Sequence, residues 1–316
     1  MPRVFVSRSL PGDALTRLAE QAEVDVWPDR MPPSPAELSR RVAEVDGLIT
    51  MITERVDDDL LAVAPRLRVV ANVAVGVDNL DLVALSRRGI AVGNTPGVLV
   101  DATADLTLAL VLAVARRVVE ADRAVRAGEW VTWDPQWLLG RQLAGATFGI
   151  LGLGAIGTAV AHRAAAFGMR VVAWNRTPRQ VDGVEMLEQE EVLRTADVLS
   201  LHCALTDDTR GLIDHRALAL MKTDAILVNT ARGPLVDEVA LEQALHAGQL
   251  FGVGLDVAAV EPMRPDHPLL TLPRVTVLPH LGSATSVTRE RMAAMAVDNV
   301  IAGLAGTPLP WPVRID

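Results

Sequence analysis

The sequence has almost no cysteine, tyrosine or lysine: among 316 residues there is one cysteine (Cys203), one lysine (Lys222) and no tyrosine. A single cysteine excludes a disulfide framework and a cysteine-rich zinc module. The lack of tyrosine excludes any mechanism that needs a catalytic tyrosine, such as that of short-chain dehydrogenases. Four of the six histidines lack the spacing of metal ligands, so we expect no metal site. These histidines are His162, His215, His246 and His267.

Basic charge and long apolar runs are also scarce. Thirty Lys and Arg residues against 39 Asp and Glu residues give a net charge of −9, the wrong sign for a nucleic-acid-binding protein. The longest apolar run, residues 106–114, is about half of the roughly 18–20 residues that a membrane span needs. Residues 4–6 predict a strand close to the amino terminus, so we expect this segment to belong to the fold and not to be a signal peptide. We expect a soluble, cytoplasmic protein that binds neither nucleic acid nor membrane.

What the sequence does contain is typical of a large folded α/β protein. Half of the residues are hydrophobic and 22% are charged, and the length favours two domains. Short β-branched runs alternate with helical patterns, which predicts doubly wound parallel sheets. In the first part of the chain we expect strands at 4–6, 24–27, 47–50, 69–73 and 90–92, and helices at 35–44 and 78–88.

The alternation of short strands and helices is interrupted after residue 100. One long helix is expected at 101–127, with Asp101 as its N-cap and Gly128 at its end. A tryptophan-rich loop, 130–137, separates it from a second and more regular strand–helix series. Its strands are expected at 147–151, 171–174, 198–201, 225–229, 252–256 and 275–278, followed by a last helix at 286–305.

The strongest local motif is a glycine loop, Gly152-Leu153-Gly154-Ala155-Ile156-Gly157. Such a motif is weak evidence alone, but here it follows an apolar strand and opens a helical pattern, 155–167. In that context the first glycine makes a tight turn, the second lets a pyrophosphate approach the backbone, and the third allows close packing of helix and strand. The loop predicts a dinucleotide site; a glycine-rich turn without a ligand is the alternative.

The residues after the next strand bear on the choice of dinucleotide. An NAD enzyme usually has Asp or Glu there to bind the ribose 2′-hydroxyl, whereas this sequence has Asn175, Arg176 and Thr177, followed by Arg179. An arginine attracts a 2′-phosphate that a carboxylate repels. We predict that NADPH is preferred and that NADH is possible. The alternative is that Arg176 is an ordinary solvated arginine.

Three polar residues follow three successive strands near the end of the chain: Arg232, Glu261 and His280. Each alone is more often a surface charge or a satisfied histidine. The carboxyl ends of parallel strands line the ligand crevice, so we expect the three side chains to converge beside the nicotinamide. In this arrangement His280 donates a proton to the substrate, Glu261 orients the imidazole, and Arg232 binds the substrate by charge-assisted hydrogen bonds.

Taken together, these motifs resemble those of the D-2-hydroxyacid dehydrogenases, and within them most closely the glyoxylate/hydroxypyruvate reductases. The resemblance extends over essentially the whole length. The segment 128–140 points to the glyoxylate/hydroxypyruvate branch, whereas Ala258, Ala259 and Val260 depart from the residues usual before the catalytic glutamate. The other matching segments are 75–78, 94–97, 152–157, 229–237, 255–262 and 279–285.

The resemblance implies an architecture and a larger set of site residues. A Rossmann cofactor domain, 98–285, is inserted into a flavodoxin-like substrate domain, 1–97 with 286–316. The backbone amides of Val75 and Gly76 hold the substrate carboxylate, and His280, Ser283 and Trp137 complete the substrate site with Arg232. Cofactor contacts are expected from Thr103, Gly152, Gly154, Ala155, Ile156, Gly157, Asn175, Arg176, Thr177, Cys203, Thr209, Thr230, Arg232, Asp256 and Gly282.

The resemblance also implies a reaction and an assembly. The expected reaction is NAD(P)H-dependent reduction of glyoxylate to glycolate and of hydroxypyruvate to D-glycerate. The alternatives are a 2-hydroxyacid dehydrogenase of other specificity (3-phosphoglycerate, broad 2-keto acids or phosphite) and a non-catalytic, nicotinamide-sensing corepressor-like protein. We expect a homodimer, because the helix at 101–127 is apolar over more of its circumference than one buried face needs, so a second face could contact a partner. The alternative is that this second face packs within the same chain. Trp137 is then expected to reach the partner's active site.

Overall fold

The computed structural model describes residues 1–314 and divides into two compact units. The terminal unit comprises Met1–Leu99 and Ala284–Asp316, and the central unit comprises Val100–Ser283. These bounds differ by two residues from the expected 1–97 with 286–316 and 98–285. No helix within residues 1–314 is long and apolar enough to cross a membrane.

The terminal unit is built on a five-stranded parallel sheet in the order β2-β1-β3-β4-β5, the flavodoxin-like order. The first and last helices cover one face with Leu18 and Val297, and the other three cover the opposite face. The strands are β1 (Arg3–Val6), β2 (Glu23–Val26), β3 (Gly47–Thr50), β4 (Val69–Asn72) and β5 (Ala91–Gly93). The helices are α1 (Ala14–Ala19), α2 (Pro35–Val42), α3 (Asp58–Ala62), α4 (Leu82–Arg87) and α11 (Ser286–Ala305).

The central unit contains a seven-stranded parallel sheet in the order β12-β11-β10-β9-β6-β7-β8. From β6 the chain adds β7 and β8 on one side, and then β9 to β12 on the other side. The change of side lies between β6 and β9, and doubly wound sheets bind ligands at this switch point. Apolar side chains form a separate core on each face of the sheet. The strands are β6 (Thr147–Leu151), β7 (Arg170–Trp174), β8 (Val184–Met186), β9 (Val198–Leu201), β10 (Ile226–Asn229), β11 (Gly252–Leu255) and β12 (Val275–Val277).

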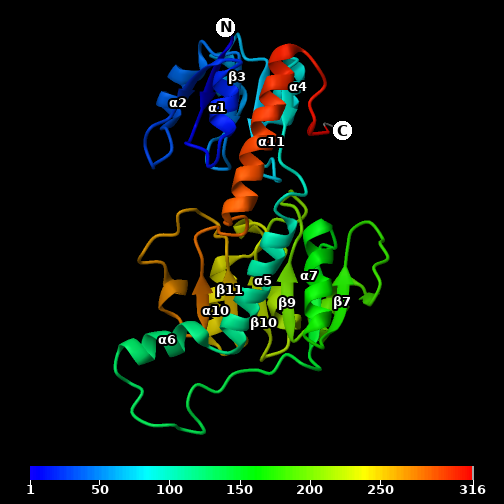
Figure 1. Cartoon of the computed structure of the whole chain (residues 1–316). Coiled ribbons are helices and arrows are strands. Elements are labelled where there is room, and N and C mark those ends of the chain that lie inside the picture. The colour runs from blue at the N-terminus through cyan, green and yellow to red at the C-terminus, as the bar shows by residue number, and fades with distance from the viewer. Residues whose placement is uncertain (315–316) are drawn as a thin grey trace. The chain divides into compact units, whose positions relative to one another are not determined.

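Helices pack on both faces of this second sheet. Figure 1 shows α5 and α7 side by side across the strands, and α5 contacts α7, β10 and β11. The helices are α5 (Val100–Ala115), α6 (Val118–Arg126), α7 (Ala155–Ala166), α8 (Gln189–Thr195), α9 (His215–Leu220) and α10 (Glu238–His246). Two 3₁₀ turns, η1 (Gly233–Leu235) and η2 (Pro268–Thr271), follow β10 and β11.

Every expected strand forms, with ends within one residue of the prediction, but several other expectations were wrong. Strand β8 was missed, because three half-exposed residues at a sheet edge give almost no periodic signal. The helix expected at 78–88 begins at Leu82, where the Asp81 side chain accepts a hydrogen bond from the Ala84 amide. The single helix expected at 101–127 is two helices.

The break between α5 and α6 lies at Arg117, whose φ of 54° is left-handed. This conformation costs about 1–2 kcal/mol for a residue with a Cβ. The Arg117 guanidinium bonds to Glu120, with Nε 2.7 Å from Oε2, which helps to hold the turn. Asp101 is not an N-cap, since α5 begins at Val100; it lies in the first turn, where a carboxylate faces the positive end of the helix.

Candidate active site

The glycine loop follows β6 and leads into α7, as the sequence predicts. Gly152 has a φ of 99°, and a Cβ there would lie 2.6 Å from the backbone nitrogen of Cys203. A Cβ on Gly157 would lie 2.2 Å from the carbonyl oxygen of Gly152. A Cβ on Gly154, in contrast, would meet no atom within 4 Å. The first and third glycines are therefore required by packing, and the second leaves open space.

This open space lies at the amino end of α7. Gly154 is the N-cap of the helix and offers no side-chain cap, and the first turn contains no acidic residue. Free helical amides and the positive end of the helix dipole are suited to a phosphate group. Ala155 and Ile156, both accessible to some degree, supply the first amides of that turn. The residues present fit a dinucleotide pyrophosphate.

The turn after β7 is bonded to the glycine loop. Asn175 Oδ1 accepts a hydrogen bond from the Leu153 amide at 2.8 Å, and Arg179 Nη1 donates to the Leu153 carbonyl at 2.9 Å. The Asn175 amide also donates to the carbonyl of Thr177 at 2.6 Å. Asn175 and Arg179 thus fix the middle of the glycine loop, while the side chains of Arg176 and Thr177 are exposed.

The three residues expected at strand ends follow neighbouring strands of the sheet. Arg232 comes after β10, Glu261 after β11 and His280 after β12. Nδ1 of His280 lies 2.8 Å from Oε2 of Glu261. Gly233 lets the Arg232 turn approach the segment before Glu261, because a Cβ on Gly233 would lie 1.9 Å from the carbonyl of Ala258. The structure therefore brings the His280–Glu261 pair together at this edge.

The Glu261 carboxylate is stabilised by positive neighbours. Its burial raises the pKa, but the hydrogen bond and charge of His280, the Ala258 amide and the charge of Arg232 outweigh burial and hold the pKa below its usual range. The Ala258 amide donates to Oε1 of Glu261 at 3.1 Å, so the unusual residues before Glu261 still support it. An ionised Glu261 accepts from Nδ1 of His280, so this contact does not use the other ring nitrogen, Nε2.

Asp256 supports the turn that presents His280. His280 has a left-handed φ of 57°, and its amide donates to the Asp256 carbonyl at 2.9 Å. The buried Asp256 carboxylate accepts from the amides of Leu281 and Gly282 at 2.6 and 2.7 Å. Burial raises the pKa of Asp256, against the effect of these amides. Sequence reasoning placed Asp256 among the cofactor contacts and missed this second role.

The remaining cofactor candidates of the central unit surround the same strand ends. Thr230 Oγ1 lies 2.9 Å from Thr107 Oγ1, whose hydroxyl also bonds to the carbonyl of Thr103. The Cys203 backbone lies against Gly152, and burial raises the pKa of the Cys203 thiol to about 11, so the thiol is protonated and unreactive. The Thr209 hydroxyl closes a turn by donating to the Ala204 carbonyl.

Four further substrate candidates lie elsewhere in the chain. Val75 and Gly76 belong to the terminal unit, in the loop that follows β4. Trp137 lies in the segment between α6 and β6 and is 36% exposed. Ser283 is the last residue of the central unit, directly after the His280 turn.

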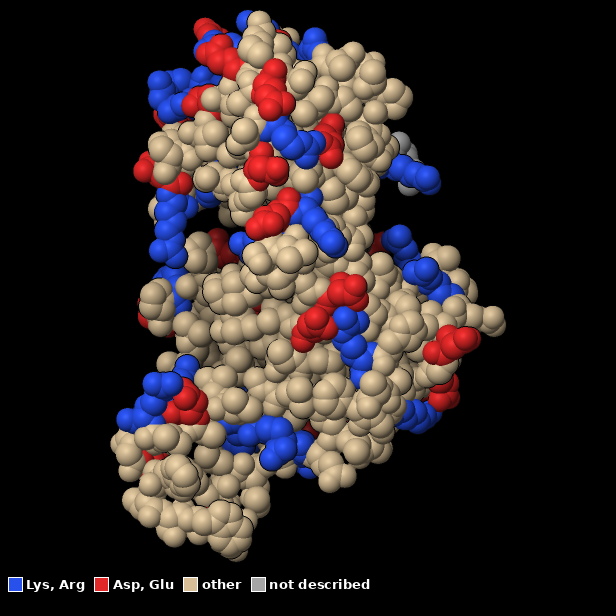
Figure 2. Space-filling view, viewed as in Figure 1, with Lys and Arg blue, Asp and Glu red and all other residues tan. Residues whose placement is uncertain are grey.

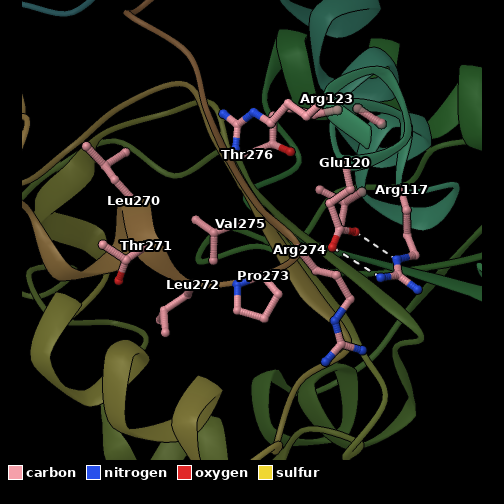
Figure 3. A pocket seen from close by; sticks show the side chains of 13 residues that line it. Arg117, Glu120, Arg123, Leu270, Thr271, Leu272, Pro273, Arg274, Val275 and Thr276 are labelled. Carbon is pink, nitrogen blue, oxygen red and sulfur yellow. Dashed lines mark hydrogen bonds and ion pairs between the residues drawn. The ribbon is translucent and has the colours of Figure 1, made fainter. Parts of the chain in front are cut away.

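A separate cavity of about 260 Å³ lies near the amino end of β12 (Figure 3). Figure 3 shows Glu120 and Arg117 on one side of it and Leu270, Thr271 and Leu272 on the other. None of the three strand-end candidates lines this cavity. The strands run away from it toward the His280 turn, so it is not the catalytic site.

Comparison with known proteins decides the family. The NAD-binding domain of D-isomer specific 2-hydroxyacid dehydrogenases matches residues 108–282. A glyoxylate reductase of Aeropyrum pernix is 48% identical over 98% of this chain and 95% of its own length. The chain belongs to the D-2-hydroxyacid dehydrogenase family. A second glyoxylate reductase, from Korarchaeum cryptofilum, is 47% identical over 95% of this chain and 92% of its own.

Solved structures of family members have the same fold. The TT0316 protein of Thermus thermophilus is 52% identical and superposes with a TM-score of 0.95 over 99% of this chain and 100% of that chain. An NADPH-dependent glyoxylate/hydroxypyruvate reductase of Sinorhizobium meliloti, solved with NADP and malonate, is 33% identical with a TM-score of 0.89. That match covers 99% of this chain and 97% of the other. The predicted fold class, two parallel α/β sheets with a Rossmann NAD-binding domain, is confirmed.

Proposed function

We propose that this dehydrogenase reduces small 2-keto acids, glyoxylate to glycolate and hydroxypyruvate to D-glycerate, and prefers NADPH. The observation that supports it most is the 2.8 Å contact between His280 and Glu261 at the strand ends of a dinucleotide-binding unit. Relatives named glyoxylate reductase match nearly the whole chain, which favours a small keto acid as substrate.

A dinucleotide bound at the glycine loop would supply the hydride for the keto carbon. His280 donates the proton from Nε2 to the oxygen that becomes negative, while Nδ1 remains bonded to Glu261. The Glu261 carboxylate keeps the ring oriented and stabilises its positive charge before the proton leaves. His280 returns to its starting state by taking a proton from water.

Arg232 binds the substrate carboxylate or keto oxygen with its guanidinium group, whose planar fork of donors matches such oxygens. Two contacts orient this residue. Asn229 donates to the Arg232 carbonyl at 2.8 Å, and Arg232 Nη1 donates to the Ala231 carbonyl at 2.8 Å. In the terminal unit, the amides of Val75 and Gly76 hold the substrate carboxylate.

The preference for NADPH is argued from the turn after β7. No acidic side chain stands at position 175, and Asn175 is engaged with the glycine loop. The exposed Arg176 is the residue that pairs with a 2′-phosphate, with Thr177 beside it.

A homodimer is proposed on different grounds from those of the sequence. The helix α5 packs against α7, β10 and β11, so its apolar side chains are covered within the central unit and need no second copy of the chain. The exposed apolar surface lies instead on the segment after α6, which includes Trp130, Trp133 and Trp137. We infer that this segment contacts a second copy of the chain.

The substrate assignment is tested by steady-state rates with glyoxylate, hydroxypyruvate, pyruvate and phenylpyruvate, each with NADPH and with NADH. We expect the highest kcat/KM for the two small substrates. Much faster reduction of pyruvate and phenylpyruvate than of both small substrates would show that the specificity is wrong. Binding of NADPH without turnover of any keto acid would favour a sensing protein instead.

A further inference from the structure

The loop after β4 has three successive backbone carbonyls that are each held by a hydrogen bond. The Ala74 carbonyl accepts from the Thr95 amide at 2.9 Å. The Val75 carbonyl accepts from Asn94 Nδ2 at 2.8 Å, and the Gly76 carbonyl accepts from Asn72 Nδ2 at 2.9 Å. Two of the three donors are asparagine side chains at the carboxyl ends of β4 and β5, so the sheet itself positions this loop.

These bonds also fix the direction of the next three amides. A trans peptide unit is planar, and its carbonyl and N–H point in opposite directions. Holding the carbonyls of residues 74, 75 and 76 therefore points the N–H groups of Val75, Gly76 and Val77 away from the asparagines. Within residues 1–314 these three amides donate no hydrogen bond. Three successive free amides offer hydrogen-bond donors that suit an anion.

The asparagine at the end of β4 is itself held firmly. Asn72 is fully buried, and its Nδ2 also lies 3.0 Å from Oδ1 of Asn79. Asn79 Nδ2 donates to the carbonyls of Met51 and Glu54, both at 2.9 Å. The loop after β4 is thus connected through two amides to the loop after β3.

A buried carboxylate completes this connection. The Glu54 side chain accepts hydrogen bonds from Ser7 Oγ at 2.5 Å and from the Met51 amide at 2.8 Å. Ser7 directly follows β1, so the ends of β1, β3, β4 and β5 all contribute to one network. The Glu54 carboxylate is also paired with a cation, since Arg8 Nη1 lies 3.3 Å from its Oε1.

We propose that Asn72 and Asn94 are positioning residues that set the amides of Val75, Gly76 and Val77 to bind the carboxylate of the 2-keto acid. The inference rests on the proposed function. The two asparagines do not touch the substrate; they act through the loop carbonyls. A neutral amide suits this role, because an aspartate lacks the N–H donor and adds a negative charge that repels an anionic substrate.

The test compares Asn94→Ala and Asn72→Ala with the wild type in the presence of NADPH. One neutral hydrogen bond corresponds to about a three- to tenfold change in binding. We expect the KM for glyoxylate to rise by that factor in each single variant. The kcat and the NADPH dissociation constant, measured by fluorescence, are expected to stay near the wild-type values, because neither asparagine belongs to the central unit.

The matched control is Asp46→Asn. Asp46 precedes β3 and lies at the amino ends of the strands, whereas the loop after β4 lies at their carboxyl ends. The Asp46 carboxylate accepts a hydrogen bond from the Arg3 amide at 2.8 Å. This variant removes the negative charge that pairs with Arg66 in the same unit, without touching the loop after β4. We expect a lower melting temperature with an unchanged KM for glyoxylate.

Two results would overturn the proposal: an unchanged KM in a folded Asn94→Ala protein, or an equal rise of KM in Asp46→Asn. If Asn72→Ala does not fold, Asn94→Ala decides alone, since the half-buried Asn94 side chain contributes one hydrogen bond. If the wild type reduces no 2-keto acid, the proposed function fails, and calorimetric binding of oxalate tests the loop separately. Weaker oxalate binding by Asn94→Ala then supports the loop, and equal binding refutes it.

Discussion

At the scale of single residues, the protonation of Glu261 links the catalytic pair to pH. Burial raises its pKa, but His280, the Ala258 amide and Arg232 together hold the pKa below the ordinary value of 4.5. A carboxyl group whose pKa is lower when folded stabilises the protein above its unfolded pKa. That contribution is lost as the pH falls from about 4.5 through the depressed folded value.

We predict that Glu261→Gln removes this pH-dependent contribution. At pH 7 the wild type should be more stable than the variant in urea unfolding, and the difference should shrink as the pH falls below about 4.5. A difference that stays constant over this range would contradict the ionised state assigned to Glu261.

A second residue-scale prediction concerns Arg176. A charge-assisted hydrogen bond contributes about 1.5–3 kcal/mol, which corresponds to roughly ten- to a hundredfold discrimination. Arg176→Ala should lower the ratio of kcat/KM for NADPH over NADH by at least about tenfold. Arg179→Ala is the matched control: Arg179 bonds to the glycine loop, so both cofactors should weaken alike. Equal use of both cofactors by the wild type would refute the role of Arg176.

At the scale of elements, helices and strands could be predicted from the sequence wherever burial of apolar side chains alone determines them. The strands β3 and β9 are buried at every position, and their short apolar runs can be recognised in the sequence without tertiary information. The break at Arg117 gave no such signal, because a left-handed arginine depends on an ion pair with Glu120 and on packing. The three residues of β8 form a strand only because β7 lies beside them.

The site follows the same division. The placement of Arg232, Glu261 and His280 after three neighbouring strands could be predicted, since parallel strands end at one edge of a sheet. The functions of Asn72 and Asn94 could not, because each depends on a hydrogen bond to a loop whose shape is set by other strands. Nor does any motif indicate that Asp256 holds the His280 turn.

The glycine loop supports a prediction at the same scale. Gly157→Ala places a Cβ 2.2 Å from the Gly152 carbonyl oxygen, so β6 and α7 must separate. Overpacking of this kind costs about 1–3 kcal/mol, and we expect a clear fall in melting temperature. Gly154→Ala meets no atom within 4 Å, so it should keep its melting temperature and instead weaken NADPH binding. Equal melting temperatures for the two variants would contradict the distinct roles of these glycines.

At the scale of the whole molecule, the segment after α6 exposes several large apolar side chains. Trp133 is 80% exposed and Val131 is 87% exposed. In Figure 2 this part of the surface, at the lower left, is mostly tan, with charges gathered above it. Exposed apolar surface of this extent usually marks a protein contact.

We predict that the chain sediments as a dimer at micromolar concentration. Trp130→Ser with Trp133→Ser should shift the equilibrium toward monomer, because these indoles lose their apolar contacts with the partner. Val83→Ser, an exposed apolar residue of α4 in the terminal unit, is the control and should leave the dimer intact. A wild-type monomer at this concentration would refute the dimer, and with it the expectation that Trp137 reaches the partner's active site.

The central claim is that His280, held by Glu261, donates the proton in 2-keto acid reduction. The most direct test is the kcat of His280→Ala with saturating glyoxylate and NADPH, with cofactor binding measured in parallel. Loss of a general acid lowers turnover by about 10²–10⁴-fold, and we predict a fall in this range with unchanged NADPH affinity. A variant that binds NADPH normally and turns over glyoxylate within a few-fold of the wild-type rate would contradict the account.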